Sequence, residues 1–155
     1  MDFELTEEHL SIQKEIRAFA RERIAPQADA NDCQERFPRD IVDGLAERGF
    51  LGGPIPREWG GRGYDFISHA IVAEEIGRVD TSMRSFYSVH CSLVSLPILR
   101  FGSEDQKRRY LPALARGEVT FCLGYTEPEA GSDLASLQTR AVADGDDYVI
   151  SGRKV

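Results

Sequence analysis

Apolar side chains recur at helical spacing in the first segment of the chain, residues 5–24. Thr6 followed by Glu7 and Glu8 is a typical helix start, because a Thr hydroxyl caps free N–H groups and acidic side chains favour the positive end of the helix dipole. The pattern predicts an amphipathic helix that ends at Ala25-Pro26. The residues on its apolar face are Leu10, Ile12, Ile16, Phe19, Ala20 and Ile24.

Four further helices are predicted from similar periodicity and from end signals. Pro38 fits the first position of a helix and Gly49 fits its stop, and the cluster at residues 80–82 can cap another helix. Ser103 and Gln106 match the capping box. The helix after residue 82 is apolar over most of its circumference, which is typical of a helix in the middle of a domain. The predicted helices span residues 38–48, 66–78, 83–100 and 104–114.

The stretch between two of these helices, residues 51–64, contains five glycines and two prolines, which is too many for a regular element. Ile55, Trp59 and Tyr64 can anchor it to the core. The sequence therefore predicts an ordered loop.

After Gly117 short β-branched and aromatic runs replace the helical pattern. Residues 119–123 and 148–150 are predicted strands, and Asp144-Gly145-Asp146-Asp147 is a predicted turn. We expect a mainly α fold with a boundary near residue 118: an all-α domain over 1–118 and the start of an incomplete β-domain over 119–155. Because the last run stops in mid-pattern, we expect that the chain is truncated or that another chain completes the fold.

Composition and charge exclude several classes of protein. The formal net charge is -7, and no cluster of Lys and Arg forms a footprint for DNA or RNA. An anionic ligand would have to be held by backbone N–H groups and single basic residues. No window resembles a membrane span, and the first ten residues are acidic where a secretory signal would be basic. We expect a cytoplasmic protein without a nucleic-acid or membrane partner.

The cysteines and histidines do not form a pattern of metal or disulfide chemistry. The three cysteines are odd in number and far apart, which favours reduced thiols with a structural role. The histidines are isolated from one another and from cysteine, so no metal is expected. The residues are Cys33, Cys91, Cys122, His9, His69 and His90.

The stretch with the most chemistry is residues 124–136, GYTEPEAGSDLAS, where a predicted strand gives way to a loop. Its small residues let backbone N–H groups approach a ligand, and the hydroxyls of Thr126 and Ser132 can donate to carbonyl or phosphate oxygens. A planar or phosphorylated ligand would suit it. From the residues alone, a Gly/Ser/Pro turn between strands is the favoured interpretation.

The same stretch resembles the signature of the acyl-CoA dehydrogenase family almost residue for residue. The resemblance covers essentially the whole chain: LTEEHLSIQKEIRAFARERIAPQA is similar to the family's first helix, PREWGGRGYD to its glycine-rich turn, and FGSEDQKRRYLPALARGEVTFCLGYTEPEAGSD to its passage from helices into the β domain. It implies a helical N-terminal domain packed on a β-barrel, with FAD and an acyl thioester between them, and a C-terminal four-helix domain that is not in this sequence.

By this resemblance, five loop residues bind FAD. Ser132 lies where the FAD pyrophosphate and the CoA arm come close, so it also contacts substrate. Tyr125 departs from the family, whose members usually carry an aliphatic residue there. Glu127 and Asp133 are expected to bond backbone N–H groups of the loop rather than to act as acid or base. The expected FAD-binding residues are Leu123, Tyr125, Thr126, Gly131 and Ser132.

A second segment bears on the substrate. The spacing of Arg84, Ser88 and Cys91 predicts one helical face. The run is similar to the segment of glutaryl-CoA dehydrogenases in which an Arg and the Ser four residues later bind a distal carboxylate, and this resemblance implies Arg84, Ser85 and Ser88 as substrate-binding residues. A pairing of Arg84 with Glu74 or Glu75 is the structural alternative.

The resemblance implies α,β-dehydrogenation of an acyl-CoA, with an electron-transfer flavoprotein as acceptor and a homodimer or homotetramer as the assembly. Enzymes of secondary metabolism that act on acyl groups bound to a carrier protein look alike in this region. The family's carboxylate base lies beyond the last residue here, so no catalytic residue is predicted and the chain alone is expected to be inactive. A non-catalytic helical interaction module, one half of a split enzyme and an unrelated flavin or nucleotide protein are the other hypotheses.

Overall fold

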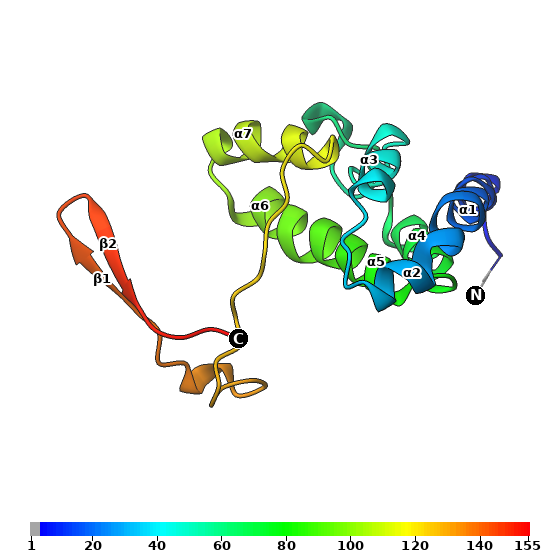
Figure 1. The fold of residues 1–155 in the computed structure, drawn as a ribbon. Helices are drawn as coiled ribbons and strands as arrows, with labels where there is room; N and C mark the ends of the chain where they lie inside the picture. The colour runs from blue at the N-terminus through cyan, green and yellow to red at the C-terminus, as the bar shows by residue number, and fades with distance from the viewer. Residues whose placement is uncertain (1–3) are drawn as a thin grey trace. The chain divides into compact units, whose positions relative to one another are not determined.

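The computed structural model describes residues 4–155, which divide into two compact units with the boundary between Phe121 and Cys122. All seven α-helices of the described residues belong to the first unit, and the second holds a two-stranded antiparallel sheet (Figure 1). The fold is mainly helical, as the sequence predicts.

Side-chain caps mark the starts of four helices. Thr6, Asp80 and Ser103 are predicted caps, and each accepts a hydrogen bond from the backbone N–H three residues later. Asp65 does the same for its helix, and the predicted capping box of Ser103 and Gln106 is confirmed. In chain order these helices are α1 (Glu7–Phe19), α4 (Phe66–Gly77), α5 (Thr81–Ser88) and α7 (Glu104–Ala115).

The predicted end of the first helix at Pro26 is wrong, because helical structure continues for seven residues beyond it. The N–H of Ala25 already bonds to the carbonyl of Ala20, five residues back, in a wide π-helical turn. Pro26 therefore falls where the regular ladder of four-residue bonds has given way, and its missing N–H breaks no α-helical bond there. The segments after α1 are η1 (Ala20–Ile24), η2 (Ala25–Gln27) and α2 (Ala28–Cys33).

Helix α3 (Arg39–Glu47) occupies the predicted segment 38–48, with Pro38 as the residue before the helix rather than its first residue. It stops before Gly49, whose φ of 73° lies in the left-handed region that glycine adopts without strain. The predicted stop signal is confirmed.

The loop that precedes α4 is ordered by close backbone packing. Ile55 is fully buried, while Trp59 and Tyr64 are half-buried, and a short 3-10 turn, η3 (Arg57–Trp59), interrupts the loop. At Gly61 the chain passes close to the backbone of Ile55: a Cβ on residue 61 would lie 1.9 Å from the carbonyl oxygen of Ile55. The prediction of an anchored loop is confirmed.

The predicted helix over residues 83–100 is helical throughout but changes type. After α5 the chain widens into a π-helix, η4 (Val89–Ser95), and then continues as α6 (Leu96–Phe101). Pro97 has no N–H to donate to the carbonyl of Leu93, so a regular α-helical ladder cannot run through this point. The wide turn lies immediately before that break.

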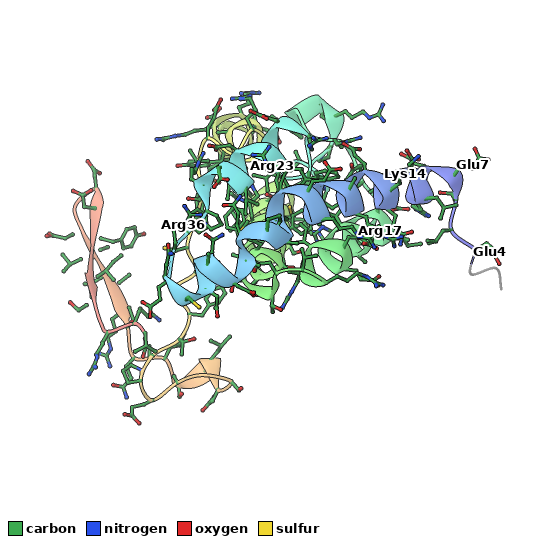
Figure 2. All side chains as sticks on the ribbon, turned by 45° about the vertical axis from the view of Figure 1, so that its right-hand side comes forward. Glu4, Glu7, Lys14, Arg17, Arg23 and Arg36 are labelled. Carbon is green, nitrogen blue, oxygen red and sulfur yellow. The ribbon has the colours of Figure 1, made fainter. Side chains whose placement is uncertain are left out.

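The core of the first unit is built from the apolar faces of α1, α3, α4 and α5, and Phe19, Phe50 and Tyr87 are its largest fully buried side chains. An ion pair joins two of these helices. Arg17 of α1 donates from Nε and Nη2 to the carboxylate of Glu75 of α4, at 2.9 and 2.6 Å, and Glu75 is only 2% exposed. Figure 2 shows Arg17 on the side of α1 that faces the green helices.

The second unit carries one antiparallel hairpin, β1 (Arg140–Asp144) and β2 (Asp147–Ser151), in which Val142 lies opposite Val149. The predicted turn at 144–147 and the strand at 148–150 are confirmed. The predicted strand at 119–123 is wrong: a strand needs a neighbour to pair its backbone groups, and no described segment pairs with these residues. Every strand residue is exposed.

Candidate functional site

The loop after Cys122 is organised around Glu127. The backbone groups of Glu127 and Ala130 bond in both directions, at 2.9 and 3.1 Å, and so close a tight turn over Pro128 and Glu129. Proline suits the first central position of such a turn because its φ is fixed. The two bonds fix the backbone of Glu127 beside that of Ala130.

The carboxylate of Glu127 ties this turn to two more distant segments. It accepts hydrogen bonds from the backbone N–H groups of Thr139 and Gln138, at 2.9 and 2.8 Å, and from the ammonium of Lys154 at 3.0 Å. Hydrogen bonding by Thr139 and Gln138, and after them by Lys154, lowers the pKa of Glu127 to about 2. The side chain is 7% exposed. The predicted structural role of Glu127 is confirmed.

For Asp133 the predicted bonds of the carboxylate to backbone N–H groups are wrong, because among residues 4–155 its backbone carbonyl makes the contacts instead. The carbonyl accepts from the N–H of Ser136 at 3.2 Å and from the Ser136 hydroxyl at 2.8 Å. These bonds close a 3-10 turn, η5 (Leu134–Ser136).

The five residues predicted to bind FAD all lie on this loop, and four of them are exposed; Leu123 is half-buried. Within the described residues, the N–H groups of Tyr125 and Thr126 and the hydroxyls of Thr126 and Ser132 make no hydrogen bond. A Cβ at Gly131 would meet nothing within 4 Å. The loop therefore presents free donors and open space, which fits a planar, acceptor-rich ligand such as a flavin.

The structural alternative for Arg84 is wrong, since its two candidate partners bind other arginines. Glu74 pairs with Arg78, and Glu75 binds Arg17. In the described part of the chain Arg84 makes no hydrogen bond or ion pair, although it is half-buried. A half-buried cation without a partner costs free energy, so this site favours the binding of an anion.

The other residues singled out in this segment are two serines of α5 and Cys91 of η4, and they differ in burial. Ser85 and Ser88 are half-buried like Arg84. Cys91 is fully buried, and its thiol lies 3.4 Å from the carbonyl oxygen of Leu51. Burial raises the pKa of the Cys91 thiol well above its ordinary value. Cys91 therefore belongs to the core rather than to a ligand-facing surface.

One hollow of the first unit lies away from these residues. A pocket of about 490 Å³ is lined by residues of α2, of the segment 35–38 after it, and of α5 with the two residues before it. None of the three predicted substrate residues of α5 lines it. Over residues 4–155 no group of three or more His, Cys, Asp or Glu could hold a metal ion. No helix in that range is long and apolar enough to cross a membrane.

Sequence reasoning missed Lys154. Its ammonium donates to the carbonyl of Tyr125 at 3.1 Å as well as to Glu127, partners that lie 29 and 27 residues away in the chain. No local spacing signals such a contact. The sequence shows only two adjacent cations, Arg153 and Lys154, with no acidic residue within the run GRKV.

Comparisons with known proteins agree with this arrangement. The profile described as "Acyl-CoA dehydrogenase, N-terminal domain" matches residues 6–118. The short-chain-specific acyl-CoA dehydrogenase of Clostridium acetobutylicum is 41% identical over 155 residues, which is 100% of this chain and 41% of that protein. This chain thus spans about 40% of the length of such relatives.

Solved structures show the same fold. The butyryl-CoA dehydrogenase of Megasphaera elsdenii superposes with a TM-score of 0.93 at 31% identity, over 100% of this chain and 42% of that one. A glutaryl-CoA dehydrogenase bound to glutaryl-CoA gives a TM-score of 0.93 at 38% identity, over 99% of this chain and 40% of that one. The free donors of the loop and the extent of these matches lead to one conclusion: the chain belongs to the acyl-CoA dehydrogenase family and carries its N-terminal domain.

Proposed function

We propose that the protein takes part in FAD-dependent α,β-dehydrogenation of an acyl thioester, an acyl-CoA with a polar or dicarboxylyl acyl group. The observation that carries the proposal is the loop with free donors at Tyr125, Thr126 and Ser132, in a chain of this family. We further propose a cytoplasmic homo-oligomer, an electron-transfer flavoprotein as acceptor, and a division into a helical domain, residues 1–118, and the start of a β domain, residues 119–155.

The loop residues suit the parts of FAD differently. The backbone around Leu123 and Tyr125 and the hydroxyl of Thr126 would hold the ring system, and Gly131 and Ser132 would hold the pyrophosphate, since small residues allow close approach of a phosphate. When bound, FAD supplies the two-electron acceptor for the β hydride. The residues of this chain bind and orient; none of them is assigned as the base that removes the α proton.

On α5, Arg84 would pair with the distal carboxylate of the acyl group, and Ser85 and Ser88 would donate hydroxyls beside it. The support is that Arg84 is half-buried and makes no ion pair within residues 4–155. An Arg guanidinium offers a carboxylate two parallel hydrogen bonds. This favours an acyl group that ends in a carboxylate over one that does not. Ser132 would contact the CoA arm.

FAD binding is tested by titrating the chain with FAD and following flavin fluorescence. We expect saturable binding that Thr126→Val and Ser132→Ala each weaken by about tenfold, which is the loss of about one good hydrogen bond. Thr120→Val is the matched control, because Thr120 is equally exposed but lies outside the loop. Absence of binding by the wild type would contradict a flavin site on this chain and would leave its family membership unaffected.

The substrate class is tested by comparing the binding of glutaryl-CoA and pentanoyl-CoA, which have the same chain length, by calorimetry in the presence of FAD. We expect a preference for glutaryl-CoA that Arg84→Gln removes, while Arg100→Gln, an exposed cation of α6, retains it. Equal binding of both thioesters by the wild type would refute the dicarboxylyl assignment.

A further inference from the structure

The last two residues of the chain bind three consecutive residues of the loop proposed to hold FAD. Lys154 Nζ donates to the carbonyl of Tyr125 at 3.1 Å and to Glu127 Oε1 at 3.0 Å, and the N–H of Val155 donates to the carbonyl of Thr126 at 3.2 Å. The segment 125–127 is thus held from one side by the segment 154–155.

These contacts use acceptors and leave donors free. The carbonyls of Tyr125 and Thr126 and the carboxylate of Glu127 are all occupied, whereas the N–H groups of residues 125 and 126 and the Thr126 hydroxyl make no bond within residues 4–155. A peptide unit held by its carbonyl can present its N–H only in the opposite direction, because the two groups are antiparallel in a planar trans peptide. The carbonyl of Tyr125 and the N–H of Thr126 belong to one such unit, so the clasp formed by residues 154 and 155 directs the N–H of Thr126 away from itself.

Lys154 and Glu127 form a partly buried pair, which distinguishes them from surface ion pairs. Their side chains are 33% and 7% exposed. Without the ammonium, Glu127 would keep its two backbone N–H partners but would leave a negative charge with little solvent beside Thr126. A flavin gains electron density on reduction, so that charge would disfavour the reduced ring.

The approach of the clasp depends on Gly152. A Cβ there would lie 2.1 Å from the Thr139 hydroxyl oxygen, so only glycine lets the chain pass Thr139 and bring Lys154 to the loop. Thr139 also donates its N–H to Glu127. Three segments of the second unit therefore converge on this one carboxylate.

We propose that Lys154 is a positioning residue for FAD: its ammonium clasps the Tyr125 carbonyl and the Glu127 carboxylate, which aims the Thr126 N–H at the ring and balances the charge of Glu127. The inference rests on the proposed function, since it needs a flavin at the loop. It assigns Lys154 no contact with substrate or with the reacting atoms.

The test compares three variants of the FAD-loaded chain by FAD affinity and by the visible spectrum and reduction potential of the bound flavin. Lys154→Met should weaken FAD binding by about tenfold, shift the flavin bands and make the potential more negative. Lys154→Arg keeps the cation and should stay within about threefold of the wild type. Lys107→Met is the matched control, because Lys107 also lies 3.0 Å from a glutamate, on α7; it should change none of the three readouts.

The outcomes separate this inference from the function on which it rests. A wild type that does not bind FAD overturns both. A wild type that binds FAD while Lys154→Met retains the same affinity, spectrum and potential overturns the inference alone. Equal loss in Lys154→Met and Lys154→Arg, with faster amide exchange at Gln138 and Thr139 in both, would show a purely structural residue and would also overturn it. Selective loss in the methionine variant, with rescue by arginine, supports it.

Discussion

Asp65 joins the starts of two helices, and its removal is expected to destabilise the first unit. Its Oδ1 accepts from the N–H of Ser68 at 2.7 Å and caps α4, while its Oδ2 lies 3.0 Å from His9 Nε2. His9 is in turn part of the capping box of α1 with Thr6. The perturbation is Asp65→Ala, which removes both contacts at once.

The magnitude follows from the pKa of the carboxyl. Hydrogen bonds from Ser68, and then from His9, lower the pKa of Asp65 from 3.8 to about 2. At full weight that difference corresponds to about 2.4 kcal/mol. The side chain is 56% exposed, and solvent screening reduces the figure to about 1 kcal/mol, within the range of about 0.5–2 kcal/mol for loss of an N-cap. The melting temperature should fall by about 2–4 °C.

The pH dependence has a definite sign. Because the folded pKa is depressed, the contribution of Asp65 is present above pH about 4 and is lost as the pH falls through about 2. The difference in unfolding free energy between wild type and Asp65→Ala should therefore be largest at neutral pH and should decrease from pH 4 downward.

The assay is urea unfolding followed by circular dichroism at pH 7, 5, 4 and 3. Asp65→Asn is the matched control: it retains a cap acceptor and loses the charge, so it should lose about half as much stability as Asp65→Ala at pH 7. A difference between wild type and Asp65→Ala that stays constant from pH 7 to pH 3, or an Asn variant as unstable as the Ala variant, would refute the reasoning.

Three further predictions concern burial and backbone packing. In the folded protein an alkylating reagent should modify two of the three thiols and spare Cys91, and mass spectrometry should find the third modified only after denaturation; the reactive pair is Cys33 and Cys122. Gly61→Ala should destabilise the first unit strongly, since its Cβ would lie 1.9 Å from the Ile55 carbonyl oxygen, whereas Gly131→Ala, with nothing within 4 Å, should leave the melting temperature unchanged. Leu45→Ala, at a fully buried site of α3, should lower the unfolding free energy by about 2–5 kcal/mol, measured by urea unfolding.

Helix starts were the part of the fold most fully predictable from sequence. Thr6, Asp80 and Ser103 cap their helices because a short polar side chain reaches an N–H only three residues ahead, which is a purely local contact. Helix ends at Gly49 and the hairpin turn around Gly145 were predictable for the same reason, since both need a left-handed residue.

Contacts between distant segments were decided by tertiary structure. Whether Arg84 pairs with a glutamate depends on which arginines lie nearest, and Arg17, from another helix, binds Glu75 instead. The strand expected at 119–123 needs a partner that local pattern cannot supply.

The loop at residues 123–132 depends on both local sequence and tertiary structure. Its sequence by itself determined the family, because a long run of specific residues is read directly from the chain. Only the tertiary structure placed Lys154 beside Tyr125 and Glu127, since a cation 27 residues away reaches a carboxylate only after the chain has turned back past Gly152. Local chemistry is encoded residue by residue, whereas the direction in which the loop presents its donors depends on which segments the fold brings against it.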